Sequence, residues 1–259
     1  MITVSSHCIE IGDGKEHLLR IQAEQRKKLH HFCSLETLDR IISSRALKLN
    51  NICNISGNAQ YEQDGIEASL LGSIFVSSLT RSIHLWNEFG DNKRGAMITF
   101  SSCTEPLHKE LIDATRYIEA YSAGQKLVAK YGFNISCVSQ PKLFCNLNKP
   151  TSIFVDLKMT DVDYTNAEPN SSIQVDGKMN LILTNVARRV ITPYITEEET
   201  RLVGILRSAN EIIEKDIDYL LLPISFNKVS TKVTFGKKVD KAKKHNLSLK
   251  LDALGISFC

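Results

Sequence analysis

The pattern of apolar and polar positions is clearest in residues 28–51, where its period changes twice. Residues 29–33 alternate, which predicts a half-buried strand. Ser34 stands where a helix N-cap belongs, and Glu36 falls in the first turn, where the helix dipole favours an anion. Alternation resumes at 46–49. This stretch therefore predicts a strand, a short capped helix and a second strand. The apolar face of that helix comprises Leu35, Leu38, Ile41 and Ile42.

The same two periods predict most of the remaining elements. Strands are expected at residues 2–4, 73–79, 96–100, 152–164, 196–206, 219–226, 232–236 and 247–251. Helices are expected at residues 15–26, 80–89, 104–131, 181–189, 210–215 and 237–244. The segment from 52 to 67 is polar and is predicted to be a long loop of the kind that often binds ligands. Because the predicted strands and helices do not follow one another in a regular order along the chain, we expect one α+β domain.

The amino-acid composition indicates a globular protein. The 259 residues are 42% hydrophobic and 24% charged, which is typical of a globular domain with a sizeable core. Seven cysteines without a C-x-x-C pair predict reduced thiols and a cytoplasmic location. We expect no secretory signal and no membrane partner, since no apolar run approaches the roughly 20 residues of a membrane helix. A net charge of +3 permits a nucleic-acid partner without arguing for one.

The common catalytic motifs are missing from the sequence. It contains no phosphate-binding G-x-x-x-x-G-K-S/T loop, no G-x-G-x-x-G after a strand, no H-E-x-x-H and no G-x-S-x-G. His30, His31 and Cys33 could begin a metal site, but adjacent histidines on a strand point to opposite faces. We therefore expect no metal.

Two features with aromatic or imidazole rings are candidates for ligand binding. His31 lies on a strand beside a helix N-terminus, although a core histidine bonded to a backbone carbonyl has the same pattern. Trp86 and Phe89 follow Ser77 and Ser78, and their i, i+3 spacing would place both rings on one face of a helix. Ordinary core packing is the alternative for this pair.

A third feature is charged. Glu197, Glu199 and Arg201 share one side of the predicted strand at 196–206, and the later residues on that side, Val203 and Ile205, are apolar. An acidic run is usually a solvated face. A charged residue next to a buried face, however, needs an ion-pair partner or a functional role, because burying an unpaired charge is costly.

These features occur in three blocks that together resemble a widespread, poorly characterised bacterial family. The block KLHHFCSLETLDRIISSRALKLNN is similar to the family's L-Y-H-Y-T-S opening followed by L-E-T-L-x-x-I-L. SLTRSIHLWNEFGDNKRG resembles its S-L-S and M-W-x-x-Y-G-x-N-x-x-G segments, and RRVITPYITEEETRLV its K-x-x-x-W/Y-x-x-E-x-E-x-R. The resemblance runs from Lys28 to the C-terminus except for residues 104–150, which would be a helical insertion in a single domain spanning 1–259.

The family is thought to share its fold with the ADP-ribosyltransferases, which implies a split, twisted antiparallel sheet with flanking helices that binds NAD. By this resemblance His31 would hold ribose hydroxyls, and Ser77 or Ser78 would support the cleft. Trp86 or Phe89 would stack on the nicotinamide or line its pocket. The late catalytic glutamate would be Glu199, with Glu197 beside it to orient the acceptor and with Arg201 keeping Glu199 ionised.

The implied function is transfer of ADP-ribose from NAD to a macromolecule, either protein or nucleic acid, or hydrolysis of NAD, without a metal. A role as a toxin or phage-defence effector follows from the family alone. One alternative is a non-enzymatic nucleotide-binding or sensor module on the same fold. Another is nucleic-acid binding through the lysines of residues 237–244, for which a solvated lysine face is the simpler explanation.

Overall fold

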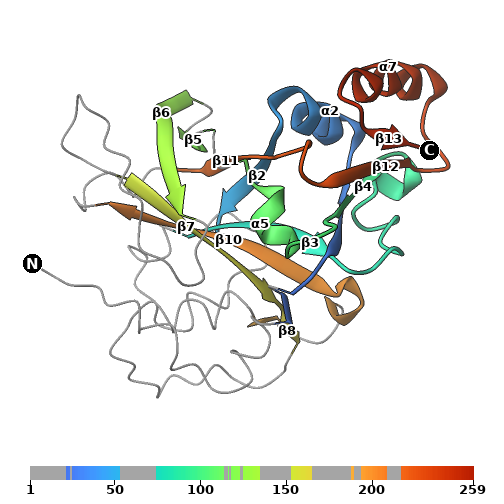
Figure 1. Cartoon of the computed structure of the whole chain (residues 1–259). Helices are drawn as coiled ribbons and strands as arrows, with labels where there is room; N and C mark the ends of the chain where they lie inside the picture. The colour runs from blue at the N-terminus through green and yellow to red at the C-terminus, as the bar shows by residue number, and fades with distance from the viewer. Residues whose placement is uncertain are drawn as a thin grey trace, which may run out of the picture.

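The computed structural model describes residues 22–23, 25–52, 74–113, 116, 118–122, 125–134, 153–164, 188–189, 194–208 and 217–259. These parts contain three helices and thirteen strands. Figure 1 shows how they are arranged. The helices are α2 (Leu35–Ser44), α5 (Leu107–Leu111) and α7 (Lys241–Ala253). The strands are β1 (Lys28–Cys33), β2 (Ala46–Asn51), β3 (Ile74–Thr80), β4 (Ala96–Ser101), β5 (Ile118–Ser122), β6 (Gln125–Asn134), β7 (Ile153–Asp161), β8 (Asp163–Tyr164), β9 (Arg188–Arg189), β10 (Glu199–Ser208), β11 (Tyr219–Pro223), β12 (Ser230–Phe235) and β13 (Ser257–Phe258). Two 3-10 helices, η3 (Asp91–Lys93) and η4 (Tyr194–Glu197), precede β4 and β10.

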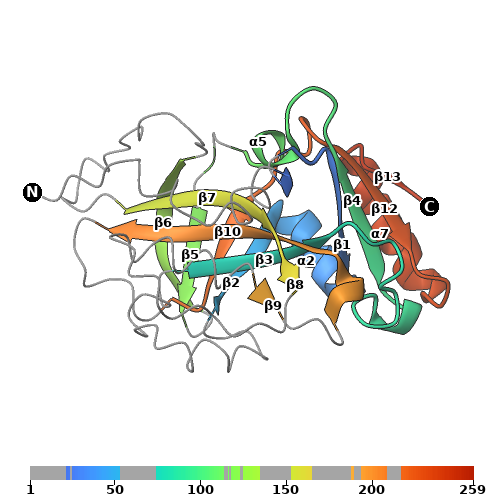
Figure 2. The same ribbon diagram turned by 90° about the horizontal axis from the view of Figure 1, so that it is seen from below.

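A large, mostly antiparallel sheet dominates the described structure, which makes the fold α+β. Its strand order is β10-β7-β6-β5-β11-β2-β3-β1-β4-β12-β13, and β10 also pairs with β3. The strands from β10 through β3 therefore close into a ring, while β1, β4, β12 and β13 extend from it as a separate wing. Figure 2 shows β5, β6, β7 and β10 on one side of the molecule and β4, β12 and α7 on the other.

The wing leaves the ring at a fork on one edge of β3. Near one end of β3, Thr80 pairs with His30 of β1. Near the other end, Phe75 and Val76 pair with β2. The opposite edge of β3 pairs continuously with β10. β1 and β2, joined by α2, thus diverge from the same edge of one strand, and the sheet is split between them.

One face of the wing is the core face. Side chains from β1, β3 and β4 join those of α2 and α7 in a single buried cluster that includes Leu29, Leu79, Ile98, Leu38 and Leu251. The two helices lie beside each other on that side (Figure 1). Alternation then places His30, Phe32, Met97 and Thr99 on the opposite face.

The helix α2 forms as the sequence predicts. Ser34 is the N-cap, and its hydroxyl accepts a hydrogen bond from the backbone N–H of Thr37 at 3.2 Å. Arg45 adopts a left-handed conformation, with φ of 51°, and ends the helix before β2 begins at Ala46. The strand–helix–strand prediction for residues 28–51 is therefore confirmed.

Several predicted elements are wrong. Of the helices expected at 104–131, α5 is the helical part among the described residues, and β5 and β6 follow it as strands, so residues 104–150 are not a helical insertion where they are described. Ile118 and Ala120 are fully buried while Glu119 between them is not, because β5 pairs with β11 and buries alternate positions. Of the helix expected at 181–189, residues 188–189 form strand β9, and residues 181–187 lie outside the described residues.

Two other stretches also differ. The strand expected at Leu247–Leu251 belongs to α7, whose N-cap Asp240 accepts from the N–H of Lys243 at 2.9 Å. The helix therefore starts at Lys241 and includes both the lysines and the apolar residues that follow them. The short helix expected at 80–89 is a series of turns.

Some predictions fall outside the described residues. They concern the strand at 2–4, most of the helix at 15–26, most of the loop at 52–67 and the helix at 210–215.

Candidate functional site

A buried ion pair stands at the start of β10. Arg201 donates from Nε to Oε1 of Glu199 at 2.9 Å and from Nη2 to Oε2 at 3.1 Å. The two residues are separated by one position, so their side chains share a strand face. Glu199 is 2% exposed and Arg201 8%. The two-pronged contact fixes the plane of the carboxylate and neutralises it where water is largely excluded.

β3 supplies a third member of the cluster. Ser78 lies directly opposite Arg201, and its hydroxyl donates to Oε1 of Glu199. Unlike the ion pair, Ser78 is exposed. A molecule at the surface can therefore approach the buried carboxylate through Ser78.

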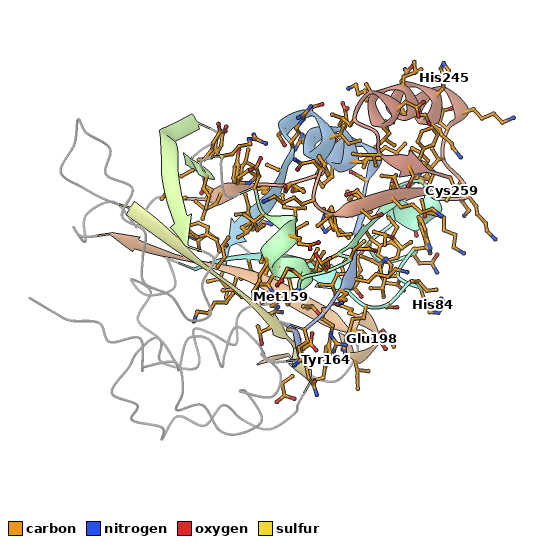
Figure 3. The ribbon with its side chains drawn as sticks, viewed as in Figure 1. His84, Met159, Tyr164, Glu198, His245 and Cys259 are labelled. Atoms are coloured by element: carbon orange, nitrogen blue, oxygen red, sulfur yellow. The ribbon has the colours of Figure 1, made fainter. Side chains whose placement is uncertain are left out.

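The backbone around Glu199 is held on both sides. Its N–H donates to the hydroxyl oxygen of Tyr164 at 2.8 Å. Thr80, opposite Glu199 on β3, donates to the carbonyl of Glu197 and accepts from the N–H of Ser82 at 2.9 Å. Figure 3 shows Tyr164 and Glu198 at the same end of the molecule. These contacts fix the point at which η4 turns into β10.

His31 lies at the fork between β1 and β3. Its Nδ1 is 3.1 Å from the carbonyl oxygen of Ser78. A carbonyl only accepts, so Nδ1 must carry the proton, and in the neutral ring Nε2 is the atom with a lone pair. Burial among protein atoms lowers the pKa of His31, and the bond to Ser78 opposes that shift only in part. This is the bond to a backbone carbonyl that the alternative interpretation, a core histidine, predicts. The carbonyl belongs to Ser78, whose hydroxyl contacts Glu199.

His30 is on the same sheet face as Glu199, and the sequence analysis missed it. His30 pairs with Thr80 of β3 and Thr99 of β4, and Thr80 pairs with Glu199. Directly opposed residues share a face, so these four form one row across four strands. Nδ1 of His30 is 2.9 Å from the Thr99 hydroxyl. Burial, and to a smaller extent the charge of Lys28, lowers the pKa of His30.

Alternation alone shows that His30 and His31 face opposite ways. It could not show which of them shares a face with Glu199, because that depends on the register of β1, β3 and β10.

The predicted aromatic pair separates. Trp86 is half-buried and meets Phe32 edge to face, with ring centroids 5.1 Å apart and planes at 88°. Leu85 and Met97 complete this small cluster. Phe89 is 44% exposed and does not belong to it. The i, i+3 argument required a helix, whereas residues 85–90 form turns.

Two more predicted residues lie away from the cluster. Ser77 is buried and, as the strand neighbour of Ser78, faces the other way. Glu197 lies in η4, and Glu198, with φ of 45°, breaks the extended backbone before β10 begins. The prediction that Glu197 shares a strand face with Glu199 is therefore wrong. The carbonyl oxygen of Glu197, not its position on a strand, ties it to Thr80.

Comparison of the chain with family models, with curated proteins and with solved structures finds no match in any of the three. Within the described residues, no three His, Cys, Asp or Glu side chains are grouped as a metal site would require. None of the helices in those parts of the chain is long and apolar enough to cross a membrane.

Proposed function

We propose that this protein is an ADP-ribosyltransferase-like enzyme that binds NAD and breaks the bond between nicotinamide and ribose. The observation that carries the proposal is the cluster of Ser78, Glu199 and Arg201 beside the fork of a split antiparallel sheet. The cluster brings together residues from two of the three sequence blocks that resemble the bacterial family. His31 from the remaining block contacts it through the Ser78 carbonyl.

The chemistry of the cluster suits this reaction. Departure of nicotinamide builds positive charge on the ribose, as in glycoside hydrolysis. A carboxylate that accepts a hydrogen bond from the ribose 2′-hydroxyl stabilises that charge most in the transition state. Arg201 holds both oxygens of Glu199, so the carboxylate is oriented before substrate arrives. The hydroxyl of exposed Ser78 occupies the direction from which a sugar hydroxyl would reach Oε1.

His31 and the aromatic cluster have two further roles in this proposal. Because His31 projects from the opposite sheet face, in this proposal it positions Ser78 through the bond to the Ser78 carbonyl and does not itself reach the ribose beside Glu199. Trp86 and Phe32 offer an apolar surface against which the nicotinamide ring would pack. This assigns to Trp86 and Phe32 the role that the sequence suggested for Trp86 or Phe89.

The acceptor of ADP-ribose in the proposal is a macromolecule, with water as the alternative that makes the protein an NAD hydrolase. A cytoplasmic bacterial toxin or phage-defence effector is the biological setting that the family resemblance suggests. The experiment is to measure nicotinamide release from NAD by the purified protein and by Glu199→Gln, each with and without cell lysate. Release that requires Glu199 and lysate supports a transferase, and release without lysate supports a hydrolase.

The near-complete burial of Glu199 favours a second candidate, a non-enzymatic module that binds a nucleotide on the same fold. Both carboxylate oxygens already accept hydrogen bonds from Arg201. This candidate predicts that NAD raises the melting temperature while no nicotinamide is released.

A further inference from the structure

The sheet face that carries Glu199 continues past the fork onto the wing, where it presents a second polar group. The row of paired residues runs from Glu199 through Thr80 and His30 to Thr99, and Lys232 of β12 pairs with Thr99. Neighbouring strands are about 4.8 Å apart, so His30 lies about 10 Å from Glu199 across this face.

Two lysines flank His30 on this face. Lys28 precedes His30 by two residues on β1, so both side chains project to the same side. Lys232 extends the row by one strand beyond Thr99. Both lysines are exposed, whereas His30 is 5% exposed and Thr99 8%. The arrangement is a buried imidazole and hydroxyl between two solvated ammonium groups.

The contacts of His30 leave one ring nitrogen for a ligand. Nδ1 is satisfied by the Thr99 hydroxyl at 2.9 Å. Within the described residues this is the one hydrogen bond of the His30 ring. Nε2 makes none there and is not fully buried. Nε2 is therefore a partly accessible polar atom of a nearly buried ring, on the sheet face from which Lys28 and Lys232 project.

We propose that His30, Thr99, Lys28 and Lys232 form an anion subsite that holds the diphosphate of the dinucleotide whose ribose reaches Glu199. The proposal rests on the proposed function and deepens it by naming His30 as a ligand-contacting residue. Two ammonium groups and an imidazole N–H match the charge and the acceptor oxygens of a diphosphate. The span of about 10 Å from His30 to Glu199 separates the diphosphate from the reacting ribose on one continuous face.

The direct test uses inorganic pyrophosphate as the probe, with binding followed by NMR of the histidine ring protons. The His30 signals, assigned by their loss in His30→Gln, are expected to shift on titration. Lys28→Met with Lys232→Met should weaken pyrophosphate binding about a hundredfold, since two charge-assisted contacts are lost and each is worth about tenfold in affinity. These two lysines are exposed, so the double variant is expected to fold.

The matched control is Lys241→Met with Lys243→Met. These lysines are exposed on α7, which packs on the core face, and the change in net charge is the same. Pyrophosphate binding should be unchanged. Equal weakening by both pairs, or His30 signals that pyrophosphate leaves unmoved, would overturn the subsite.

A second probe separates this proposal from the proposed function. Glu199→Gln should retain pyrophosphate binding at His30, because the two residues lie about 10 Å apart. If pyrophosphate binds at His30 but the wild-type protein never releases nicotinamide from NAD, the anion subsite stands and the enzymatic assignment fails. If nicotinamide is released while pyrophosphate does not affect His30, the enzymatic assignment stands and the subsite fails.

Discussion

Arg201 contacts both oxygens of Glu199 from two positions further along the same strand, with distances of 2.9 and 3.1 Å. Both side chains are almost fully buried, so the contact joins two charges that are largely shielded from water. A pair of this kind contributes little net stability compared with apolar residues, but removing one partner leaves an uncompensated charge. The pair therefore orients the carboxylate more than it strengthens the fold.

Arg201→Met is expected to destabilise the protein by about 3–5 kcal/mol, because Glu199 would remain buried without the guanidinium that contacts both of its oxygens. The double variant Glu199→Gln with Arg201→Met should recover part of that loss, since both charges of the pair are removed. Urea unfolding of the wild type, the two single variants and the double variant measures the coupling. Additive losses would show that the two side chains do not act as a pair.

Ser78→Ala is expected to lower nicotinamide release about tenfold or more and to change the free energy of unfolding by less than about 1 kcal/mol. The hydroxyl contacts the carboxylate of Glu199, but the side chain is exposed, so little packing is lost. Steady-state kinetics and urea unfolding measure the two effects.

Ser77→Ala is the matched control for this experiment. It removes the same atom from the neighbouring residue, which is buried on the opposite face of β3. We expect catalysis to be unchanged even if stability falls. A loss of activity as large as that of Ser78→Ala would mean that the serines act through the strand and not through Glu199.

Stability should fall as the pH drops below the ordinary histidine pKa of 6.5. Burial lowers the pKa of both His30 and His31, so the unfolded chain binds protons that the folded chain does not. The loss begins near pH 6.5 and continues down to the folded pKa values, by at most about 1.4 kcal/mol per pH unit for each histidine. Urea unfolding at pH 7.5 and 5.0 measures it, and His31→Gln should reduce the difference. An unchanged difference would show that His31 titrates normally.

Cys33 should resist thiol reagents in the native protein. Burial raises the pKa of its thiol to about 12, which leaves almost no thiolate at neutral pH. Cys103 and Cys259 are exposed and serve as internal references. Alkylation at pH 8 followed by peptide mass spectrometry should label both references well before Cys33. Labelling of all three at similar rates would contradict the buried position of β1.

The single tryptophan reports on the aromatic cluster. Trp86 fluorescence is expected to change when nicotinamide mononucleotide binds, because the proposed function places the nicotinamide ring against Trp86 and Phe32. Phe32→Leu should weaken that response, whereas Phe89→Ala should preserve it, since Phe89 is exposed and outside the cluster. An equal effect of both substitutions would remove Phe32 from the binding surface.

Local signals in the sequence determined a substantial part of this fold. The residues of β1 alternate, those of β3 and β4 form short apolar runs, and the side chain of Ser34 caps α2. Each of these elements therefore follows from residues close to it in the sequence. Local alternation also placed Glu199 and Arg201 on one face of β10, so their pairing could be predicted from the sequence.

Only the tertiary structure decided the elements whose local signals conflict. Ile118–Ser122 carries apolar residues that fit either period, and pairing with β11 makes it a strand. Leu247–Leu251 also reads as a strand, but the cap at Asp240 starts a helix that continues through it. Short apolar runs fit both periods, so distant partners decide between them.

The candidate site shows the same division. The sequence identified Ser78, Glu199 and Arg201 as candidates without showing which serine contacts the glutamate. It also favoured His31, whereas His30 is the histidine on the Glu199 face. Each strand fixes its own two faces by alternation, because side chains repeat every two residues. Which faces of β1, β3 and β10 coincide depends on their pairing register. That register is set by hydrogen bonds between distant segments, since Thr80 lies 50 residues after His30 and 119 before Glu199.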